Sequence, residues 1–168
     1  QAAIRSVPKS MDRPTASHDA NATGTLNMLI AARDAGKVKR FVYASSSSAY
    51  GDQKKFPQKV TYKPQPISPY AVQKLTGEHY AIMFSKAMGL ETVSLRYFNV
   101  FGPRARTSGT YGAVFGVFLA QVLAGEPLTI VGDGEQTRDF TFVTDVVDAF
   151  LTAAAAPFAG RAYNVGSG

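Results

Sequence analysis

Tyr70 and Lys74 lie four positions apart in the segment SPYAVQK, residues 68–74. Because residues four apart share one face of a helix, the phenol and the ammonium can address one ligand together. A free tyrosine ionises only near pH 10, but a neighbouring ammonium and a cationic cofactor both favour the phenolate. The pair is therefore typical of a general base that takes a proton from a substrate hydroxyl.

A run of serines, residues 45–48, precedes this pair in the chain. It ends the β-branched and aromatic segment KRFVYASS, which predicts a buried strand. Ser46, Ser47 and Ser48 are the candidates for holding the same substrate oxygen and passing its proton. A Tyr-x-x-x-Lys pair alone often arises by chance, and a serine run alone is usually a loop. Their combination, a strand that ends in serines followed by a helix that opens with the pair, indicates catalysis.

Predicted helices and strands alternate along the chain. Apolar residues at helical spacing predict a helix over 12–35, and Ser68-Pro69 and Gly89 mark the start and end of a second over 69–88. Further helices are predicted over 111–124 and 144–156. Strands are predicted over 39–46, 91–100 and 162–168, and within 127–143 two short strands are predicted to flank a hairpin turn at Asp133-Gly134. This alternation implies an α/β fold with parallel βαβ units. Ligands of such sheets bind beyond the carboxyl ends of the strands.

Composition narrows the class of protein. A net charge of +6 could suggest nucleic acid, but the Lys and Arg residues are scattered without interleaved aromatic residues, so we expect a small anionic ligand and no nucleic acid. No stretch is apolar enough for a membrane span, and the first residues lack the apolar core of a signal peptide. The absence of cysteine favours a cytoplasmic protein. No His, Asp and Glu grouping has metal-ligand spacing, so no metal is expected.

Four ordered blocks carry a resemblance to a known family: YASSSSAYGD, SPYAVQK, LRYFNVFGPR and GDGEQTRDFTFVTD. In this order they resemble the NAD-dependent nucleotide-sugar epimerases and dehydratases of the extended short-chain dehydrogenase/reductase family. The resemblance implies a Rossmann-like, doubly wound parallel sheet with elements of a small substrate-binding subdomain. Residues 1–100 would form part of an NAD-binding domain that carries the catalytic residues. Residues 101–168 would supply substrate-binding elements interleaved with the last strands.

The resemblance also implies roles for individual residues. Ser46, Tyr70 and Lys74 match the family's catalytic trio. Tyr70 would be the base for the 4-hydroxyl of the sugar, Ser46 would hydrogen-bond the 4-oxygen, and Lys74 would bind the nicotinamide ribose and lower the pKa of Tyr70. NAD would take a hydride from sugar C4 and return it to the other face of the 4-keto sugar.

Further positions match ligand-binding residues of the family. Those on the cofactor side, besides Tyr70 and Lys74, are Ala2, Ala3, Asn21, Tyr43, Ala44, Tyr97 and Phe98. Those on the substrate side are Ser46, Ser47, Ser48, Asn99 and Arg138, of which Asn99 and Arg138 would bind the diphosphate. For Asn99 a strand-end cap, and for Arg138 a surface ion pair with Asp139 or Glu135, are the alternatives that the residues alone leave open.

The serines favour one reaction over others. Dehydratases of the family typically carry an Asp–Glu pair at the places of Ser47 and Ser48, because elimination of water needs an additional acid and base. The resemblance therefore favours a 4-epimerase for a UDP-hexose or UDP-N-acetylhexosamine, closest to the UDP-glucose and UDP-N-acetylglucosamine 4-epimerases. The alternatives are a 4,6-dehydratase, a reductase, a decarboxylase, or a fragment that binds a nucleotide sugar without catalysis.

The sequence departs from the family pattern in one respect. It lacks the strand, glycine-rich turn and helix that hold the pyrophosphate of NAD. We therefore expect a truncated chain that is inactive alone. The resemblance further implies a homodimer that pairs helices 14–35 and 69–88 of each copy.

Overall fold

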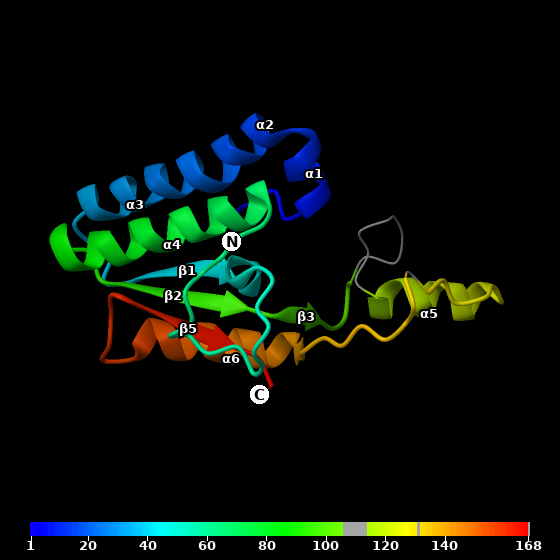
Figure 1. Ribbon diagram of the computed structural model, residues 1–168. Helices are drawn as coiled ribbons and strands as arrows, with labels where there is room; N and C mark the ends of the chain where they lie inside the picture. Colours follow the sequence, from blue (N-terminus) through cyan, green and yellow to red (C-terminus); the bar gives the residue numbers. More distant parts are fainter. Residues whose placement is uncertain (106–113, 131, 168) are drawn as a thin grey trace.

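The computed structural model describes residues 1–105, 114–130 and 132–167 (Figure 1). Three parallel strands form its main sheet in the order β1-β2-β5: β1 (Phe41–Ser46), β2 (Thr92–Tyr97) and β5 (Arg161–Val165). The register places Tyr97 opposite Ser46 on one side and opposite Val165 on the other. The carboxyl ends of the three strands therefore meet at one edge, as predicted for a ligand-binding α/β sheet.

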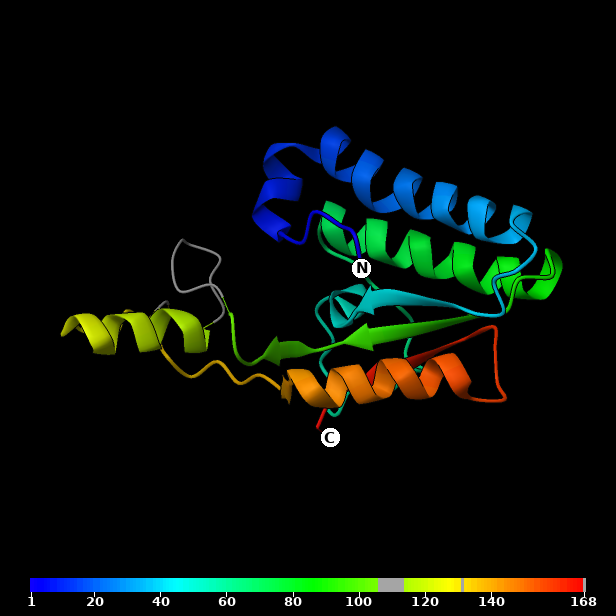
Figure 2. The same cartoon turned by 180° about the vertical axis from the view of Figure 1, so that it is seen from behind.

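Helices cover both faces of this sheet. Helices α3 (Gly24–Asp34) and α4 (Pro69–Ala87) lie on one face, and α6 (Val143–Ala155) lies on the other (Figures 1 and 2). Because side chains alternate along a strand, β1 supplies both cores, Phe41 and Tyr43 to one and Val42 to the other. Phe41 and Tyr43 of β1 pack with Leu29, Phe84 and Leu90 beneath the α3–α4 layer. On the other face, Val93, Leu95 and Val165 pack with Val146 and Ala153 of α6.

The helix predicted over 12–35 is interrupted. The structure has α1 (Val7–Asp12), α2 (Pro14–His18), a π-helical turn (Asp19–Thr23) and then α3. The side chain of Ser6 caps α1 by accepting a hydrogen bond from the Lys9 N–H. Arg13 separates α1 from α2 with φ −130° and ψ 67°, because a residue before proline is kept out of the helical region.

A second, small sheet extends the end of β2. The strand predicted over 91–100 breaks at Phe98, whose N–H bonds Val165 O, and continues as β3 (Asn99–Phe101). β3 pairs in parallel with β4 (Phe140–Phe142). The predicted hairpin at Asp133-Gly134 is therefore wrong: of the described residues in 127–143, only those of β4 form a strand. The rings of Phe140 and Phe142 lie 6.3 and 5.3 Å from that of Phe101, so aromatic packing joins segments that are distant in sequence.

Helix α5 (Val114–Ala124) projects away from the main sheet on an arm that begins at β3 and returns to β4 (Figures 1 and 2). Residues 111–113 of the predicted helix lie outside the described residues. Several apolar side chains of the arm are exposed, including Leu119, Val122, Leu123 and Ile130. Across the described residues, no helix combines the length and apolar character needed to cross a membrane.

Candidate active site

The first turns of α4 present Tyr70 and Lys74 to the end of β1. Ser68 caps the helix by accepting a hydrogen bond from the Ala71 N–H, 3.2 Å away, and Pro69 occupies the first turn. The Tyr70 N–H, one of the helix's free donors, bonds Ser10 Oγ at 3.0 Å. The start of α4 is thus fixed by its own cap and by a serine of α1.

Lys74 lies in the interior, with only 6% of its surface exposed. Its Nζ donates to Ala44 O of β1 at 2.8 Å and lies 5.3 Å from the ring centre of Tyr43 and 6.0 Å from that of Tyr70. Burial lowers the pKa of Lys74 to about 8, because desolvation disfavours the ammonium. Lys74 therefore couples α4 to the carboxyl end of β1.

Tyr70 and Ser46 meet across the same gap. Burial raises the pKa of the Tyr70 phenol, while a hydrogen bond with the Ser46 side chain and the charge of Arg5 both lower it. The net effect is a raised pKa of Tyr70. The expectation that Lys74 lowers this pKa is therefore wrong for the chain alone. The physical reason is that Lys74 is directed at the Ala44 carbonyl, and burial outweighs the effects of Ser46 and Arg5 on the phenolate.

A short turn fixes Ser46. The 3-10 turn Ser47–Tyr50 follows β1, and Ser46 Oγ accepts from Ser48 N at 3.2 Å and from Ser48 Oγ at 2.8 Å. Gly51 ends the turn at φ 65°, where a Cβ would stand 1.7 Å from Gln65 O, so only glycine fits. The structure therefore brings the predicted trio of Ser46, Tyr70 and Lys74 together at one strand end.

A buried ion pair lies beneath the trio. The carboxylate of Glu78 accepts from Arg96 Nε at 2.9 Å, from Arg96 Nη2 at 2.6 Å and from Ser45 Oγ at 2.7 Å. Sequence reasoning did not single out Glu78 or Arg96. The signal was present, however, since Tyr70, Lys74 and Glu78 follow one another at four-residue spacing and so share one helix face.

Asn21 and Tyr43, both predicted on the cofactor side, act within the protein interior. Asn21 Oδ1 accepts from Ile4 N at 2.7 Å, and its Nδ2 donates to Ile4 O and to Gln73 Oε1. Asn21 thus holds the segment that contains Ala2 and Ala3. The buried ring of Tyr43 packs beneath α4, and its hydroxyl donates to Lys74 O at 3.3 Å. The side chain of Tyr43 is thus directed at α4, and its backbone is part of β1, the strand that ends at Ser46.

The remaining predicted positions follow the end of β2. Tyr97 lies beside Ser46 in the register, and Phe98 bridges β2 and β3. Asn99 donates through N and Nδ2 to Asp139 O, at 3.2 and 3.1 Å. Arg138 is exposed, and its Nη1 donates to Thr137 O. Asn99 and Arg138 thus lie at the beginning of the β3–β4 pair.

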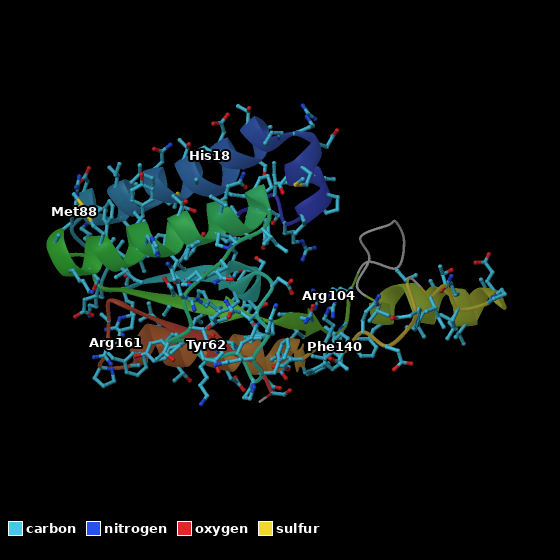
Figure 3. The ribbon with its side chains drawn as sticks, viewed as in Figure 1. His18, Tyr62, Met88, Arg104, Phe140 and Arg161 are labelled. Atoms are coloured by element: carbon cyan, nitrogen blue, oxygen red, sulfur yellow. The ribbon has the colours of Figure 1, made fainter. Side chains whose placement is uncertain are left out.

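A cavity of about 540 Å³ lies between the N-terminal segment and the end of β3. Its lining residues are Ala3, Ile4, Arg5, Ser6 and Lys9, with Val100, Phe101, Gly102, Pro103, Arg104, Ala105 and Val143. Arg104 is at the base of the arm, where β3 leaves the sheet (Figure 3). Of these residues, sequence reasoning had selected only Ala3.

Comparison with known proteins agrees with this arrangement. A sequence model described as the NAD dependent epimerase/dehydratase family matches residues 1–166. The chain belongs to this family. A UDP-glucose 4-epimerase of Mycolicibacterium smegmatis is 40% identical over 168 residues, which are 99% of this chain and 53% of the relative. The UDP-N-acetylglucosamine 4-epimerase of Methanobrevibacter ruminantium, solved with UDP-N-acetylmuramic acid, is 38% identical with a TM-score of 0.95, over 99% of this chain and 53% of that one.

Relatives with other activities match as well. A UDP-glucuronic acid decarboxylase of Arabidopsis thaliana is 40% identical over 136 residues, which are 78% of this chain and 30% of the relative. The dTDP-glucose 4,6-dehydratase DesIV of Streptomyces venezuelae is 27% identical with a TM-score of 0.89, over 100% of this chain and 51% of that one. The chain spans about half the length of the first curated relatives that it matches. The match confirms the α/β Rossmann-like fold that the sequence predicts.

The residues present fit the cofactor that the family uses. An ammonium has three N–H donors, and Ala44 O accepts one from Lys74, so the others are available to vicinal ribose hydroxyls. The carboxyl ends of β1 and β2, with Tyr70 alongside, form the edge at which such folds bind dinucleotides. The donor set and its position are thus suited to NAD.

Proposed function

We propose that the chain is the catalytic part of an NAD-dependent nucleotide-sugar 4-epimerase acting on a UDP-hexose or UDP-N-acetylhexosamine. The observation that carries this proposal is the meeting of Ser46, Tyr70 and Lys74 at the carboxyl end of β1. Family membership and the two epimerase relatives support it. The chain spans only 53% of each of these two enzymes, so the activity of the whole protein is itself proposed.

The chemistry divides among few groups. When bound, NAD supplies the hydride acceptor and donor for sugar C4. Tyr70 takes the proton of the 4-hydroxyl, and Ser46, fixed by two hydrogen bonds from Ser48, holds the 4-oxygen and directs it at the phenol. Lys74 binds the nicotinamide ribose and keeps α4 against β1. Asn21 orients the Ala2–Ala3 segment as a second wall of the cofactor side.

The nucleotide part of the substrate is assigned to the beginning of the β3–β4 pair. Asn99 and the exposed fork of Arg138 suit a diphosphate, which guanidinium groups bind through two hydrogen bonds. Residues 1–100 would then carry cofactor and catalytic functions, and residues 101–168 substrate functions.

The dehydratase reading is the second candidate, since a dehydratase is among the solved relatives. Elimination of water needs an acid and a base besides Tyr70. Ser47 and Ser48 occupy the places that could supply them, and Ser48 Oγ is a donor to Ser46. Hydroxyl groups of ordinary acidity cannot perform both tasks, which favours epimerisation over dehydration.

A Tyr70→Phe substitution in the full-length protein tests the proposal. We expect conversion of a UDP-hexose to its C4 epimer to fall by at least roughly 100-fold, because the base is removed while the ring remains. Binding of UDP-sugar, measured by calorimetry, should persist. Tyr62→Phe in the loop between β1 and α4, labelled in Figure 3, is the matched control and should retain full activity.

Three results would contradict the proposal. Undiminished turnover by Tyr70→Phe would remove Tyr70 from the base position. Formation of a 4-keto-6-deoxy sugar, a pentose or a reduced sugar by the unmodified protein would instead assign a dehydratase, decarboxylase or reductase. Binding of the UDP-sugar without any conversion would favour the non-catalytic alternative.

We further propose that the protein forms a homodimer through the helical layer of α2, α3 and α4. On α4, Val72, Thr76, His79 and Met83 follow one another at helical spacing on the side away from the sheet, and Val72 and Met83 are exposed. Met28 of α3 is exposed beside them. Exposed apolar side chains on two neighbouring helices suit pairing with a second copy.

A further inference from the structure

The cavity between the N-terminal segment and the end of β3 is strongly cationic. Arg5 and Lys9 line it from one side, and Arg104 lines it from the other. The described residues that line it include no Asp or Glu. A concave site of about 540 Å³ with basic side chains on two opposite walls favours an anionic group.

The backbone that lines this cavity after β3 has an unusual conformation. Gly102 adopts φ 150°, and a Cβ there would stand 2.6 Å from Val143 Cγ1, so only glycine allows the chain after β3 to pack against the start of α6. Arg104 has φ 65°, a left-handed conformation that residues with a side chain rarely adopt. Such conformations cluster at ligand sites, where the surrounding structure enforces them.

One wall of the cavity is tied to the helix start that carries Tyr70. Ser10 Oγ accepts from the Tyr70 N–H at 3.0 Å and donates to Val7 O at 2.6 Å, which ties the wall that carries Arg5 and Lys9 to the start of α4. Arg5 is close enough to Tyr70 for its charge to lower the pKa of the phenol. A sugar whose 4-hydroxyl reaches Tyr70 therefore lies next to Arg5, which also lines the cationic cavity.

We propose that Arg5, Lys9 and Arg104 bind a carboxylate on the sugar ring, so that the preferred substrate class is a nucleoside diphosphate hexuronic acid. This inference rests on the proposed 4-epimerase function and replaces the neutral sugar named there with the corresponding uronic acid. A guanidinium fork matches a carboxylate through two parallel hydrogen bonds, and the site offers two such forks. The same cations could bind a phosphate, but the groups assigned to the diphosphate, Asn99 and Arg138, lie at the opposite end of β3, about 7 Å away along the strand.

Kinetics of the full-length protein with two substrates test the proposal. UDP-glucuronic acid and UDP-glucose differ only in the carboxylate, so the ratio of their kcat/KM values isolates its contribution. We expect the unmodified protein to favour the acid by about tenfold or more, and Arg104→Gln to remove about tenfold from the acid while changing UDP-glucose less than about twofold. Arg161→Gln is the control, since Arg161 is exposed at the far end of β5 (Figure 3).

Each other outcome has one reading. Equal losses for both substrates in Arg104→Gln would place the cations on the diphosphate and overturn the carboxylate proposal, and so would a preference of the unmodified protein for UDP-glucose. Should Arg104→Gln fail to fold, Arg5→Gln and the salt dependence of KM serve instead. Raising ionic strength from about 0.05 M to about 0.5 M should raise KM more for the acid than for UDP-glucose, and equal slopes would overturn the proposal.

Failure of the proposed function is distinguishable from failure of this inference. If neither sugar turns over, the epimerase proposal fails. The calorimetric affinities for UDP-glucuronic acid and UDP-glucose then test by themselves whether the cavity binds a carboxylate. Tighter binding of the acid that Arg104→Gln abolishes supports the carboxylate site. Equal affinities refute it.

Discussion

Lys74 combines two demands that oppose each other. Its proposed role of binding ribose hydroxyls requires a cation, yet it is buried between α4 and β1 with the Ala44 carbonyl as its hydrogen-bond acceptor. A carbonyl dipole compensates only part of the hydration that an ammonium loses. The lowered pKa of about 8 is the direct result, and it means that the protonated form destabilises the fold at neutral pH.

This conflict predicts a specific pH dependence of stability. The unfolded chain holds the Lys74 proton up to about pH 10.4, whereas the folded chain releases it near pH 8, so the unfolded state binds more protons between these values. The free energy of unfolding should therefore rise with pH across this window, by up to roughly 3 kcal/mol. Above about pH 10 the rise should reverse, because burial raises the pKa values of Tyr43, Tyr70 and Tyr97, and unfolded tyrosines ionise first.

Lys74→Met isolates this contribution. Methionine keeps most of the volume and removes the titrating group, so urea unfolding at a series of pH values should show no rise between pH 8 and 10 for this variant. Lys37→Met on the exposed turn after α3 is the control and should keep the rise of the unmodified protein. Parallel curves for Lys74→Met and the unmodified protein would show that Lys74 does not titrate in this window.

The site could be predicted from sequence only as far as local spacing reaches. The Tyr70–Lys74 spacing and the serines at the end of β1 indicated the site, because a helix face and a strand end are local features, and the family resemblance selected Ser46 among the serines. The cavity lined by Arg5 and Arg104 was missed, since it forms only where the N-terminal segment passes the end of β3. The direction of the pKa shift of Tyr70 could not be predicted from the sequence either, because burial, which raises this pKa, is a property of the whole fold.

The elements show the same limit. The Ser68-Pro69 start of α4 was predicted, and the structure confirms it through the Ser68 cap. The hairpin at Asp133-Gly134 failed, because the turn signal is local whereas β4 pairs with β3 through aromatic packing across the arm. No turn residue marks the break of β2 at Phe98 either; the bond from its N–H to Val165 O comes from a strand formed much later in the chain.

Helix α4 is tied to the sheet by the Glu78–Arg96 pair, in which the two side chains are 1% and 5% exposed. The guanidinium also lies 4.7 Å from the ring centre of Tyr50, which joins the turn after β1 to β2. Because a buried pair loses much of its attraction to desolvation, its main effect is on geometry: it fixes α4 relative to β1 and β2. The distance between Ser46 and Tyr70 depends on this link.

Removing one partner should therefore cost far more than removing both. Glu78→Gln leaves the Arg96 cation buried without a counter-charge and should lower the free energy of unfolding by about 3–5 kcal/mol. The double variant Glu78→Gln with Arg96→Gln should recover more than half of this loss. Glu91→Gln, which removes the exposed carboxylate of the pair with Arg40, is the control and should cost less than about 1 kcal/mol, because Glu91 is 60% exposed and Arg40 keeps the Ala153 and Phe158 carbonyls as acceptors. Urea unfolding measures all three, and a Glu78→Gln loss as small as the Glu91→Gln loss would show that the buried pair contributes little.

At the scale of the whole molecule, two apolar surfaces compete for partners. One is formed by the exposed side chains of Met28, Val72 and Met83 on α3 and α4, the helices that cover one face of the main sheet (Figure 1). The other is the projecting arm, where Leu123 is 79% exposed. The arm is attached through the short β3–β4 pair, whereas α3 and α4 pack on the main sheet, so only the helical layer offers a rigid, preorganised surface.

Dimerisation through the helical layer should accordingly respond to charge on that layer alone. Met28→Lys with Met83→Lys places two cations per copy in the proposed interface, where burying them without partners is unfavourable, and should raise the dimer dissociation constant by at least about 100-fold. Light scattering after size exclusion should then show the monomer mass. Val122→Lys with Leu123→Lys makes the matching change on α5 and should leave the dimer mass unchanged, since a rigid partner surface is lacking there. The reverse pattern, a monomer only when α5 is charged, would assign the contact between copies to the arm instead.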